Sequence, residues 1–365
     1  MNQIKVELGE RSYPIFIGTG ILPKLKEMLD SIGLGRSVAV ITNTTVDKLY
    51  GSQLRAILQL SAEGERFIVI PDGERFKVLK TVEGIYTRLL EVGCERNTTI
   101  LAFGGGVVGD IAGFAAATFL RGVPYVQVPT TLLAQVDSSV GGKVGVNHPK
   151  GKNLIGAFYQ PRLVCIDVSV LQTLPERELM AGLAEVVKYG VIWDADFFNF
   201  LAENFPKLVD LEFAMMEKVV QRCCEIKSEV VAQDEREKNL RMILNFGHTV
   251  GHALEAVTGY KRFRHGEAVA LGMRSEAKMA LARGFLSRAE FEKLENLLNQ
   301  IKIKATLQGI ETDALHSAMK LDKKVRDGKL RIVLPKKLGQ VVICDDVEKP
   351  IIMAGLRYLV GDTRS

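Results

Sequence analysis

Residues 98–119 read TTILAFGGGVVGDIAGFAAATF: a short apolar run, a cluster of glycines, and then a segment compatible with a helix. This order predicts a strand that turns directly into a helix. Glycines at such a turn let the backbone approach a phosphate, and the helix N-terminus offers free N–H groups and the positive end of its dipole. Tight packing of a helix on a strand also selects glycine, so the stretch alone leaves phosphate binding and packing open.

Other short β-branched runs alternate with helix-like stretches through the first half of the chain. The expected strands are Ser37–Ile41, Arg66–Ile70, Thr98–Phe103, Tyr125–Val128 and Leu163–Asp167. Between them, residues 79–92 carry apolar side chains at helical spacing. The alternation predicts a parallel sheet wrapped by helices, so we expect a Rossmann-like α/β domain.

After Pro175 the pattern changes to long helical stretches. The expected helices are Glu176–Val191, Phe213–Gln233, Gly247–Thr258, His265–Arg283 and Arg288–Gln300. A late segment, Lys329–Ile343, predicts a small hairpin because a Pro-Lys-Lys-Leu-Gly turn interrupts it. We therefore expect an α/β domain over residues 1–170 and a mainly helical domain over residues 171–365.

Composition argues against several classes of protein. The 365 residues are 47% hydrophobic and 25% charged, which is typical of a globular protein. The net charge of +5 is small and the basic residues are scattered, so nucleic acid is not an expected partner. The five cysteines include no Cys-x-x-Cys pair, so we expect neither a disulfide framework nor a thiolate zinc site.

Two segments bear on membranes and export. The apolar stretch 100–119 has the length of a membrane span, but Asp110 lies at its centre and several glycines would weaken a lone helix. The first ten residues carry three charges and lack the apolar core of a secretory signal. We therefore expect a cytoplasmic protein with no membrane partner.

Polar side chains follow the ends of several expected strands. Asp72 and Glu74 come directly after one strand, where carboxylates suit the hydroxyls of a ribose. Local sequence alone favours another role for Asp72, that of a helix N-cap in a surface turn. The other polar residues at or after strand ends are Lys77, Thr130, Thr131, Asp137, Lys143 and Lys152. Together these positions predict one shared crevice.

Three of the five histidines lie within residues 248–265. His248 and His252 are four residues apart in a helical segment and so share one face, and Glu255 follows on that face. Spacing alone nominates these three residues as metal ligands, with His265 outside the set. The alternative is two helical histidines bonded to neighbours in a seam between domains.

With these motifs assembled, the chain resembles the 3-dehydroquinate synthase family of sugar phosphate cyclases over nearly its whole length. The matching segments are LAFGGGVVGDIAGFAAATFLRG (101–122), VPTTLLAQVDSSVGGKVGVNHPKGKNLIG (128–156), AGLAEVVKYG (181–190), NFGHTVGHALE (245–255) and HGEAVALGM (265–273). The resemblance implies the fold of the glycerol dehydrogenase group, an active site in the cleft between the two domains, and a homodimer. Arg264 departs from the apolar residue expected before the last segment.

The resemblance also implies the site residues. The implied zinc ligands are Glu185, His248 and His265, which moves His252 to the substrate side. The implied NAD contacts are Asp72, Gly73, Glu74, Lys77, Gly105, Gly106, Val107, Val108, Gly109, Asp110, Thr130, Thr131, Asp137, Lys143, Lys152, Leu171, Gln172 and Thr173. The implied substrate contacts are Arg121, Asp137, Lys143, Lys152, Asn153, Lys188, Lys227, Arg241, Asn245, His248, His252 and Lys324, where Lys323 is the alternative to the last. The implied catalytic residues are Lys143, Lys188, Lys227, Glu237, Arg241, Asn245 and His252, with Glu237 as an acid/base helper.

The implied reaction is that of a phosphate-eliminating carbon–oxygen lyase of the shikimate pathway, which leads to chorismate and the aromatic amino acids. It converts 3-deoxy-D-arabino-heptulosonate 7-phosphate to 3-dehydroquinate and phosphate, with NAD returned to its starting state and with Zn²⁺, or Co²⁺ as a substitute. Three alternatives stay open at this point: a cyclase of a neutral sugar phosphate, a zinc polyol dehydrogenase that releases NADH, and a non-catalytic nucleotide-binding protein.

Overall fold

The computed structural model describes residues 1–60, 66–321, 325–326 and 329–361. It divides into two compact units, one of residues 1–174 and 213–236, the other of residues 175–212 and 237–365. The first division falls four residues after the predicted boundary near residue 170. Residues 213–236, which we placed in the helical domain, instead pack with the first unit.

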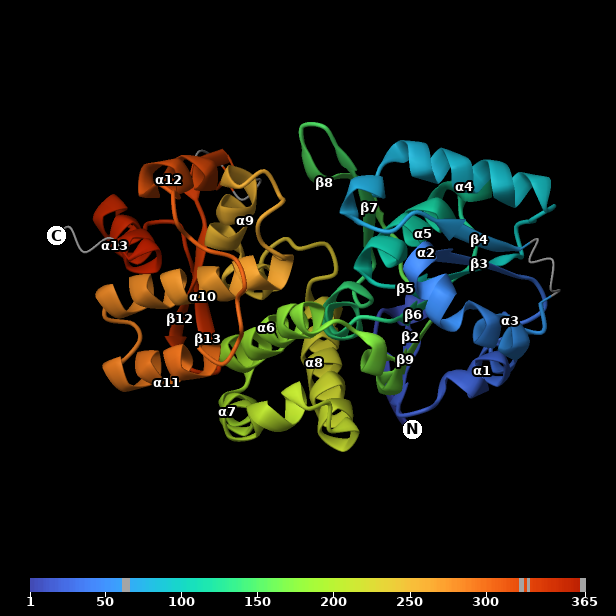
Figure 1. Cartoon of the computed structure of the whole chain (residues 1–365), viewed down its shortest axis with the longest axis horizontal. Coiled ribbons are helices and arrows are strands. Elements are labelled where there is room, and N and C mark those ends of the chain that lie inside the picture. Colours follow the sequence, from blue (N-terminus) through green and yellow to red (C-terminus); the bar gives the residue numbers. More distant parts are fainter. Residues whose placement is uncertain (61–65, 322–324, 327–328, 362–365) are drawn as a thin grey trace. The chain divides into compact units, whose positions relative to one another are not determined.

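Within the described residues, the first unit contains one seven-stranded sheet in the order β1-β2-β9-β6-β5-β3-β4 (Figure 1). Its strands are β1 (Asn2–Val6), β2 (Tyr13–Gly18), β3 (Val38–Asn43), β4 (Phe67–Ile70), β5 (Thr99–Gly104), β6 (Tyr125–Pro129) and β9 (Leu163–Asp167). Only β1 runs antiparallel to its neighbour. The five predicted strands are confirmed and are mutually parallel, whereas the β1–β2 hairpin was not predicted.

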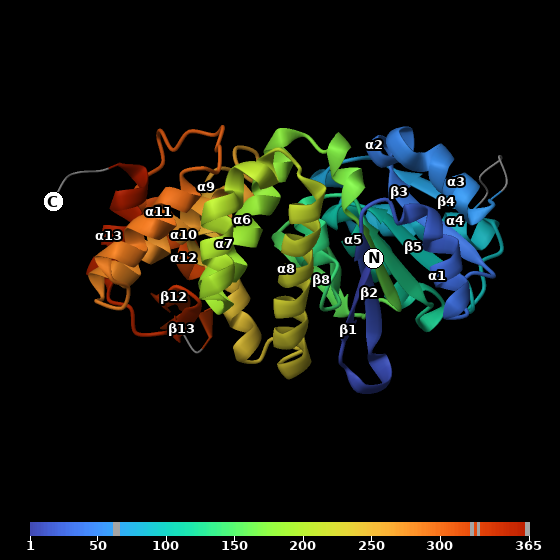
Figure 2. The ribbon, with the colours of Figure 1, turned by 90° about the horizontal axis from the view of Figure 1, so that it is seen from below.

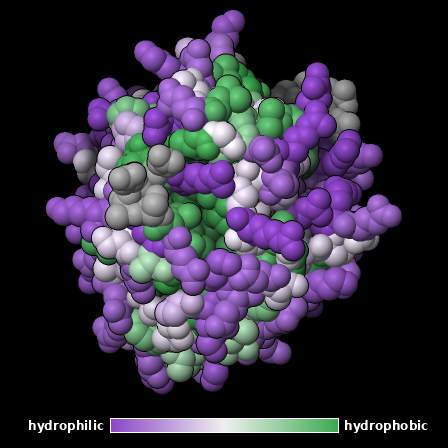
Figure 3. Space-filling model, turned by 90° about the vertical axis from the view of Figure 1, so that its right-hand side faces the viewer, coloured by the Kyte–Doolittle hydropathy of each residue, from purple (hydrophilic) through white to green (hydrophobic). Residues whose placement is uncertain are grey.

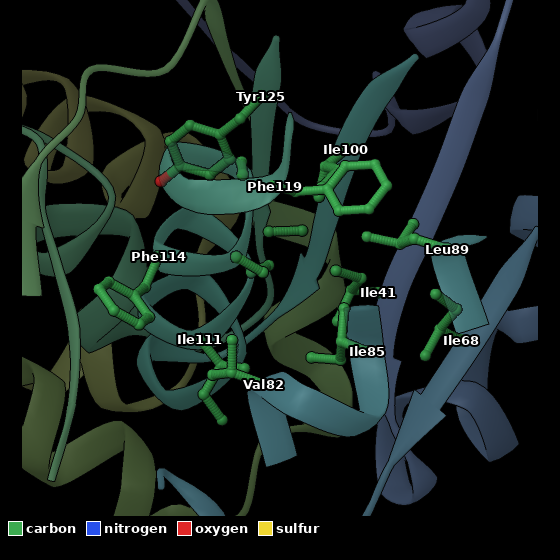
Figure 4. Packing of buried hydrophobic residues seen from close by; sticks show 14 of the residues in the cluster. Ile41, Ile68, Val82, Ile85, Leu89, Ile100, Ile111, Phe114, Phe119 and Tyr125 are labelled. Atoms are coloured by element: carbon green, nitrogen blue, oxygen red, sulfur yellow. The ribbon is translucent and has the colours of Figure 1, made fainter. Parts of the chain in front are cut away.

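Apolar side chains cover both faces of this sheet. Along β3, Ala39 and Ile41 belong to one core, while Val38 and Val40 belong to the other, as the two-residue repeat of a strand requires. Figure 4 shows the first core, where Ile41 and residues of α4 and α5 pack together. The helices of this unit are α1 (Leu25–Ser31), α2 (Thr44–Val46), α3 (Ser52–Leu58), α4 (Leu79–Glu91), α5 (Gly106–Thr118) and α8 (Phe213–Gln233).

Helix α8 belongs to the first unit because it lies alongside β1 and β2 (Figure 2). The side chain of Asn2 donates a hydrogen bond to Gln221 Oε1 at 2.7 Å, and Thr19 Oγ1 donates to Glu217 Oε2 at 3.1 Å. Helical periodicity correctly predicted that residues 213–233 are a helix. It could not predict which core the helix covers, because its partner strands lie about 200 residues earlier.

A second hairpin, β7 (Lys143–His148) with β8 (Gly151–Phe158), was not predicted either. Gly145 pairs with Gly156, and a Cβ on Gly145 would lie 2.5 Å from the carbonyl oxygen of Ile155. The glycines therefore allow an unusually close approach of the two strands.

The second unit is mainly helical. Its helices are α6 (Glu176–Trp193), α7 (Ala195–Val209), α9 (His248–Val257), α10 (His265–Ala282), α11 (Arg288–Leu298), α12 (Thr312–Leu321) and α13 (Lys349–Val360). Its short strands are β10 (Val325–Arg326), β11 (Lys329–Leu330), β12 (Ile332–Lys337) and β13 (Gln340–Cys344). The five predicted helices and the late hairpin are confirmed, while α7, α12 and α13 were not predicted.

The apolar stretch 100–119 is divided between β5 and α5 rather than forming one long helix. Among the described residues, none of the helices combines the length and the apolarity needed to cross a membrane.

Candidate active site

Three helices of the second unit bring Glu185, His248 and His265 together. Glu185 lies in the middle of α6, and the two histidines are the first residues of α9 and α10. Glycines make these helices approach closely. A Cβ on Gly266 would lie 2.0 Å from the carbonyl oxygen of Ala181 in α6, and one on Gly272 would lie 1.9 Å from that of Gly247. The small residues therefore position the helix ends that carry the histidines.

The donor atoms of this trio converge on one point. Glu185 Oε1 lies 3.5 Å from His248 Nε2 and 3.6 Å from His265 Nε2. Donor atoms bound to one zinc ion at about 2.0–2.2 Å lie roughly 3.3–3.6 Å apart in a tetrahedron. Glu185 is 1% exposed, and its Oε1 has no hydrogen-bond donor within the part of the chain that the structure describes. The three side chains therefore fit a metal ion.

The second nitrogen of each histidine supports the same conclusion. His248 Nδ1 lies 3.1 Å from the carbonyl oxygen of Phe246, and His265 Nδ1 lies 3.3 Å from Glu255 Oε2. Both oxygens accept hydrogen bonds, so when the rings are neutral each Nδ1 carries the proton and each Nε2 presents a lone pair. Two nitrogen lone pairs and a carboxylate oxygen that face one another repel unless a cation lies among them. This arrangement of ring nitrogens is the usual one for metal-bound histidines.

The set nominated by spacing, His248, His252 and Glu255, is not a metal-binding group among the described residues. The two groups that could hold an ion are Glu185, His248 and His265, and His252, Glu255 and His265. His265 belongs to both, so its exclusion on spacing was wrong. Helical periodicity compares only residues on one helix, whereas Glu185, His248 and His265 lie on three different helices.

Other predicted residues lie on the same unit. Lys188, one turn after Glu185, forms an ion pair with its Oε2 at 2.5 Å, and both side chains are buried. The ring of His252 lies 5.5 Å from that of His248, between centroids. Arg241 is buried and Asn245 ends the same short helical segment, Leu240–Asn245. Asn245 Nδ2 donates to Glu237 Oε1 at 2.9 Å.

In the first unit, the glycine cluster joins β5 to α5 as predicted. Gly105 is the N-cap of α5 and has no side chain to accept hydrogen bonds from its first N–H groups. A Cβ on Gly105 would lie 3.0 Å from Thr131, and one on Gly106 would lie 3.0 Å from Ser138. A Cβ on Gly109 would lie 2.6 Å from Gln127, so this glycine serves packing on β6. Packing therefore accounts for Gly109, while Gly105 stands at the helix N-terminus that the sequence nominated for a phosphate.

Two buried lysines of the first unit each pair with a carboxylate. Lys77 forms a short ion pair with Asp110 in the first turns of α5, and it donates to Asn153 Oδ1 at 2.6 Å. Burial opposes the charge of Lys77, but Asp110 and Glu74 outweigh that effect and raise the pKa of Lys77 above its ordinary value. Lys227 of α8 lies 2.8 Å from Asp137 Oδ1. Both lysines are buried.

Asp72 is not a helix N-cap. Gly73 occupies that position, and the Asp72 carboxylate accepts hydrogen bonds at 2.8 Å from Asn43 Nδ2 and from Thr45 Oγ1. The sequence analysis missed Asn43 and Thr45. Asn43 ends β3 and Thr45 follows it, at the sheet edge where β4, β5 and β6 also end, so their place at the end of a strand was the available signal.

The remaining predicted residues have these places. Glu74 accepts from Asn147 Nδ2 at 2.7 Å, and Thr130 and Thr131 directly follow β6. Leu171, Gln172 and Thr173 lie in the short helical segment Val168–Thr173, where Thr173 contacts the hydroxyl of Tyr50 at 2.8 Å. Val107 and Val108 belong to the first turn of α5. Lys143 begins β7, and Lys152 lies in β8. The predicted Lys324 and its alternative Lys323 lie outside the described residues.

Three predicted residues have backbone conformations that non-glycine residues rarely adopt. Arg121, Asn153 and Glu237 have φ angles of 69°, 54° and 55°. Such strain is common at functional sites, where the surrounding structure holds a side chain in place.

A groove of about 450 Å³ lies between β4 and α4, and none of the predicted site residues lines it. Figure 3, which faces this side of the first unit, shows apolar surface framed by hydrophilic side chains.

Comparison with known proteins covers nearly the whole chain. A family model described as 3-dehydroquinate synthase N-terminal matches residues 67–181, and one described as 3-dehydroquinate synthase C-terminal matches residues 182–325. A 3-dehydroquinate synthase of Desulforamulus reducens is 50% identical over 359 residues, which are 98% of this chain and 99% of the relative. One of Thermodesulfovibrio yellowstonii is 48% identical over 94% of this chain and 96% of the relative.

Solved structures agree on the fold. A 2-epi-5-epi-valiolone synthase from Streptomyces hygroscopicus subsp. jinggangensis with NAD⁺ and Zn²⁺ bound has a TM-score of 0.86 and 30% identity, covering 97% of this chain and 98% of that one. A 2-deoxy-scyllo-inosose synthase complexed with carbaglucose-6-phosphate, NAD⁺ and Co²⁺ has a TM-score of 0.84 and 27% identity, covering 98% and 99%. A probable glycerol dehydrogenase from Sinorhizobium meliloti, at 16% identity and a TM-score of 0.65, covers 96% and 97% and shares the fold alone.

Proposed function

The chain belongs to the 3-dehydroquinate synthase family, and from this premise we propose that it converts 3-deoxy-D-arabino-heptulosonate 7-phosphate to 3-dehydroquinate and phosphate. The steps are a transient oxidation, elimination of phosphate, reduction, ring opening and aldol closure, with NAD restored at the end. The observation that carries the proposal is the 50% identity to a 3-dehydroquinate synthase over 98% of the chain.

We propose Glu185, His248 and His265 as the ligands of Zn²⁺, with Co²⁺ as a substitute. The support is the convergence of Glu185 Oε1 and the two Nε2 atoms at 3.5 and 3.6 Å. When bound, such an ion polarises a substrate oxygen and favours removal of hydride from the carbon that bears it. Three protein ligands leave a coordination position open, which is typical of a catalytic site and not of a structural one.

We propose that NAD binds at the carboxyl edge of the parallel sheet. The uncapped N-terminus of α5 presents N–H groups to a pyrophosphate, and the glycines allow its backbone to approach. Asp72, fixed by Asn43 and Thr45, would accept from ribose hydroxyls. The other proposed cofactor contacts are the residues named above on the segments that end the strands. NAD supplies the hydride acceptor and returns the hydride later.

Residues of the chain itself would bind and orient the substrate. Lys188, held on Glu185, places a positive charge beside the metal ligands, where it suits a substrate carboxylate or alkoxide. Arg241 offers a planar fork for two phosphate oxygens, and Lys152 and Asn153 offer further donors. Asn245 and Glu237 form a hydrogen-bonded pair that would fix a substrate hydroxyl and move a proton. The departing phosphate could collect the proton at the neighbouring carbon, which reduces the need for a dedicated base.

A cyclase of a neutral sugar phosphate is the second candidate, because two similar structures are such cyclases at 30% and 27% identity. The higher identity to 3-dehydroquinate synthases favours the acidic substrate. Lys188 and Arg241 are buried cations of the second unit, and a substrate carboxylate suits them better than a neutral sugar does. We also propose a cytoplasmic homodimer, and sedimentation would then give twice the chain mass of 40.3 kDa.

The test is to incubate the purified protein with the heptulosonate phosphate, catalytic NAD and Zn²⁺, and to follow phosphate release, the product by NMR, and NADH by absorbance. We expect stoichiometric phosphate and 3-dehydroquinate without net NADH. Removal of the metal by a chelator, or the change Glu185→Ala, should lower the rate by roughly a thousandfold, about 4 kcal/mol. Glu203→Ala, an exposed carboxylate on α7, is the control and should be silent. Turnover of sedoheptulose 7-phosphate or glucose 6-phosphate instead would establish the second candidate, and net NADH would indicate a dehydrogenase.

A further inference from the structure

Glu255 is a buried carboxylate on α9, two turns after His248. It is 3% exposed, and its Oε2 lies 3.3 Å from His265 Nδ1. We propose that Glu255 is a positioning residue for the metal centre: it fixes the tautomer and the orientation of His265 so that Nε2 points at the metal. This inference rests on the proposed ligand set, but it concerns metal binding and not the identity of the substrate.

The tautomer argument begins with the chemistry of a carboxylate. An ionised carboxylate only accepts hydrogen bonds, so the contact with Glu255 places the proton of a neutral His265 on Nδ1. The lone pair is then on Nε2, the atom that lies 3.6 Å from Glu185 Oε1. A negative charge behind the ring also makes Nε2 a stronger donor to a cation.

His248 shows why His265 needs this help. The Nδ1 of His248 contacts the backbone carbonyl of Phe246, an acceptor that the fold supplies without any side chain. The side chain of His248 is 10% exposed, whereas that of His265 is 36% exposed. The more exposed ring is less constrained by packing, so its orientation depends more on a specific partner. Glu255 approaches from α9, and His265 begins α10, so the contact also ties the two helices together.

The contact has a competing explanation within the same side chains. His252, Glu255 and His265 are themselves close enough to hold an ion. An ion there would use His265 Nδ1 and would make Glu255 a ligand instead of a hydrogen-bond acceptor. An ion bound there in addition to the one at Glu185 would give two ions per chain, whereas the proposed role gives one. An ion bound there alone would not use Glu185 or His248, so Glu185→Ala would leave Co²⁺ affinity unchanged.

The experiment measures metal binding without substrate, so it does not depend on which sugar phosphate the protein converts. Co²⁺ affinity is determined by competition with a chelator for the unaltered protein, Glu255→Gln and Glu255→Leu. We expect affinity to fall by roughly 10–100-fold, more for Leu than for Gln, because Gln keeps an oxygen that can accept from Nδ1. The visible spectrum of the Co²⁺-loaded Leu variant should also change. Glu295→Gln is the matched control, since Glu295 is a buried carboxylate of the same unit that binds Arg274 and Tyr358.

A double-substitution cycle tests whether Glu255 acts through His265. In a His265→Ala background, Glu255→Gln should leave Co²⁺ affinity unchanged, because the ring that it positions is gone. Thermal unfolding of the metal-free variants reports any loss of stability separately. The proposal is overturned if Glu255→Gln binds Co²⁺ within twofold of the unaltered protein, if its effect persists without His265, or if the unaltered protein binds two ions and the variant one.

Discussion

In the first unit, Lys77 and Lys227 each meet a carboxylate of the chain, whereas in the second unit Glu185 faces two histidine nitrogens that carry lone pairs. In the first unit, a carboxylate of the chain balances the charge of each lysine. In the second unit, one oxygen of Glu185 has no hydrogen-bond donor among the described residues. The difference explains why side-chain geometry points to a metal ion in one unit, while the dinucleotide site that we propose in the other rests on strand ends, a glycine turn and the family.

The largest expected effect comes from the glycine contact that brings His265 to Glu185. Gly266→Ala would place a Cβ 2.0 Å from the carbonyl oxygen of Ala181, so α10 must move away from α6. We expect a loss of about 3 kcal/mol in the free energy of unfolding, and weaker Co²⁺ binding than in the unaltered protein. Denaturant unfolding and chelator competition would measure the two effects.

Gly84→Ala is the control for this substitution, because Gly84 also lies in a helix but a Cβ there would meet no atom within 4 Å. It should be neutral or stabilise the protein by up to about 1 kcal/mol. Equal Co²⁺ affinity in Gly266→Ala and the unaltered protein would show that close packing of α6 and α10 does not set the metal geometry.

The intermediate effect concerns the buried ion pair of the first unit, Lys77 with Asp110, and tests whether the two charges stabilise each other. Lys77→Met removes the partner of Asp110 in a largely buried place, and it should cost about 2 kcal/mol of unfolding free energy. The double change Lys77→Met with Asp110→Asn should recover much of that loss, because no unpaired charge is left. Unfolding of the two single variants and the double variant gives the coupling. Additive losses would mean that the pair contributes nothing as a pair.

The fold was predictable to the extent that it depends on local periodicity. The β-branched runs gave five parallel strands, and the helical spacing gave α6, α8, α9, α10 and α11. The assignment of α8 to the first unit was not predictable, because a helix of residues 213–233 carries no local sign that β1 and β2 cover its apolar face. The β1–β2 and β7–β8 hairpins were missed for a related reason: their register depends on pairing between segments.

The candidate site was predictable in part for the same physical reason. Spacing found His248 and His252 because they share one helix, but it could not find Glu185, which lies 63 residues earlier. It also could not show that Glu255 lies beside His265, because a face of one helix says nothing about a ring on the next helix. The family resemblance supplied the trio, and the structure brings the three side chains together. Gly266 and Gly272 mark where the helices approach closely, so these two glycines were the sequence signal for the contacts between helices.

The smallest effect concerns an exposed ion pair of the first unit, which should contribute less than the buried Lys77 pair. Glu235, just after α8, accepts hydrogen bonds from Arg11 and from Gln160, and these lower the pKa of Glu235 from its usual 4.5. A carboxyl whose pKa is lower in the folded than in the unfolded chain stabilises the fold above the unfolded value, and this contribution is lost as the pH falls through the folded value. Because Arg11 is largely exposed, we expect Glu235→Gln to cost at most about 1 kcal/mol at pH 7. The difference between the two proteins should shrink as the pH falls below 4.5 and vanish below the lowered pKa of folded Glu235, as urea unfolding across a pH series would show. A difference that stayed constant across the series would assign the effect to packing and not to charge.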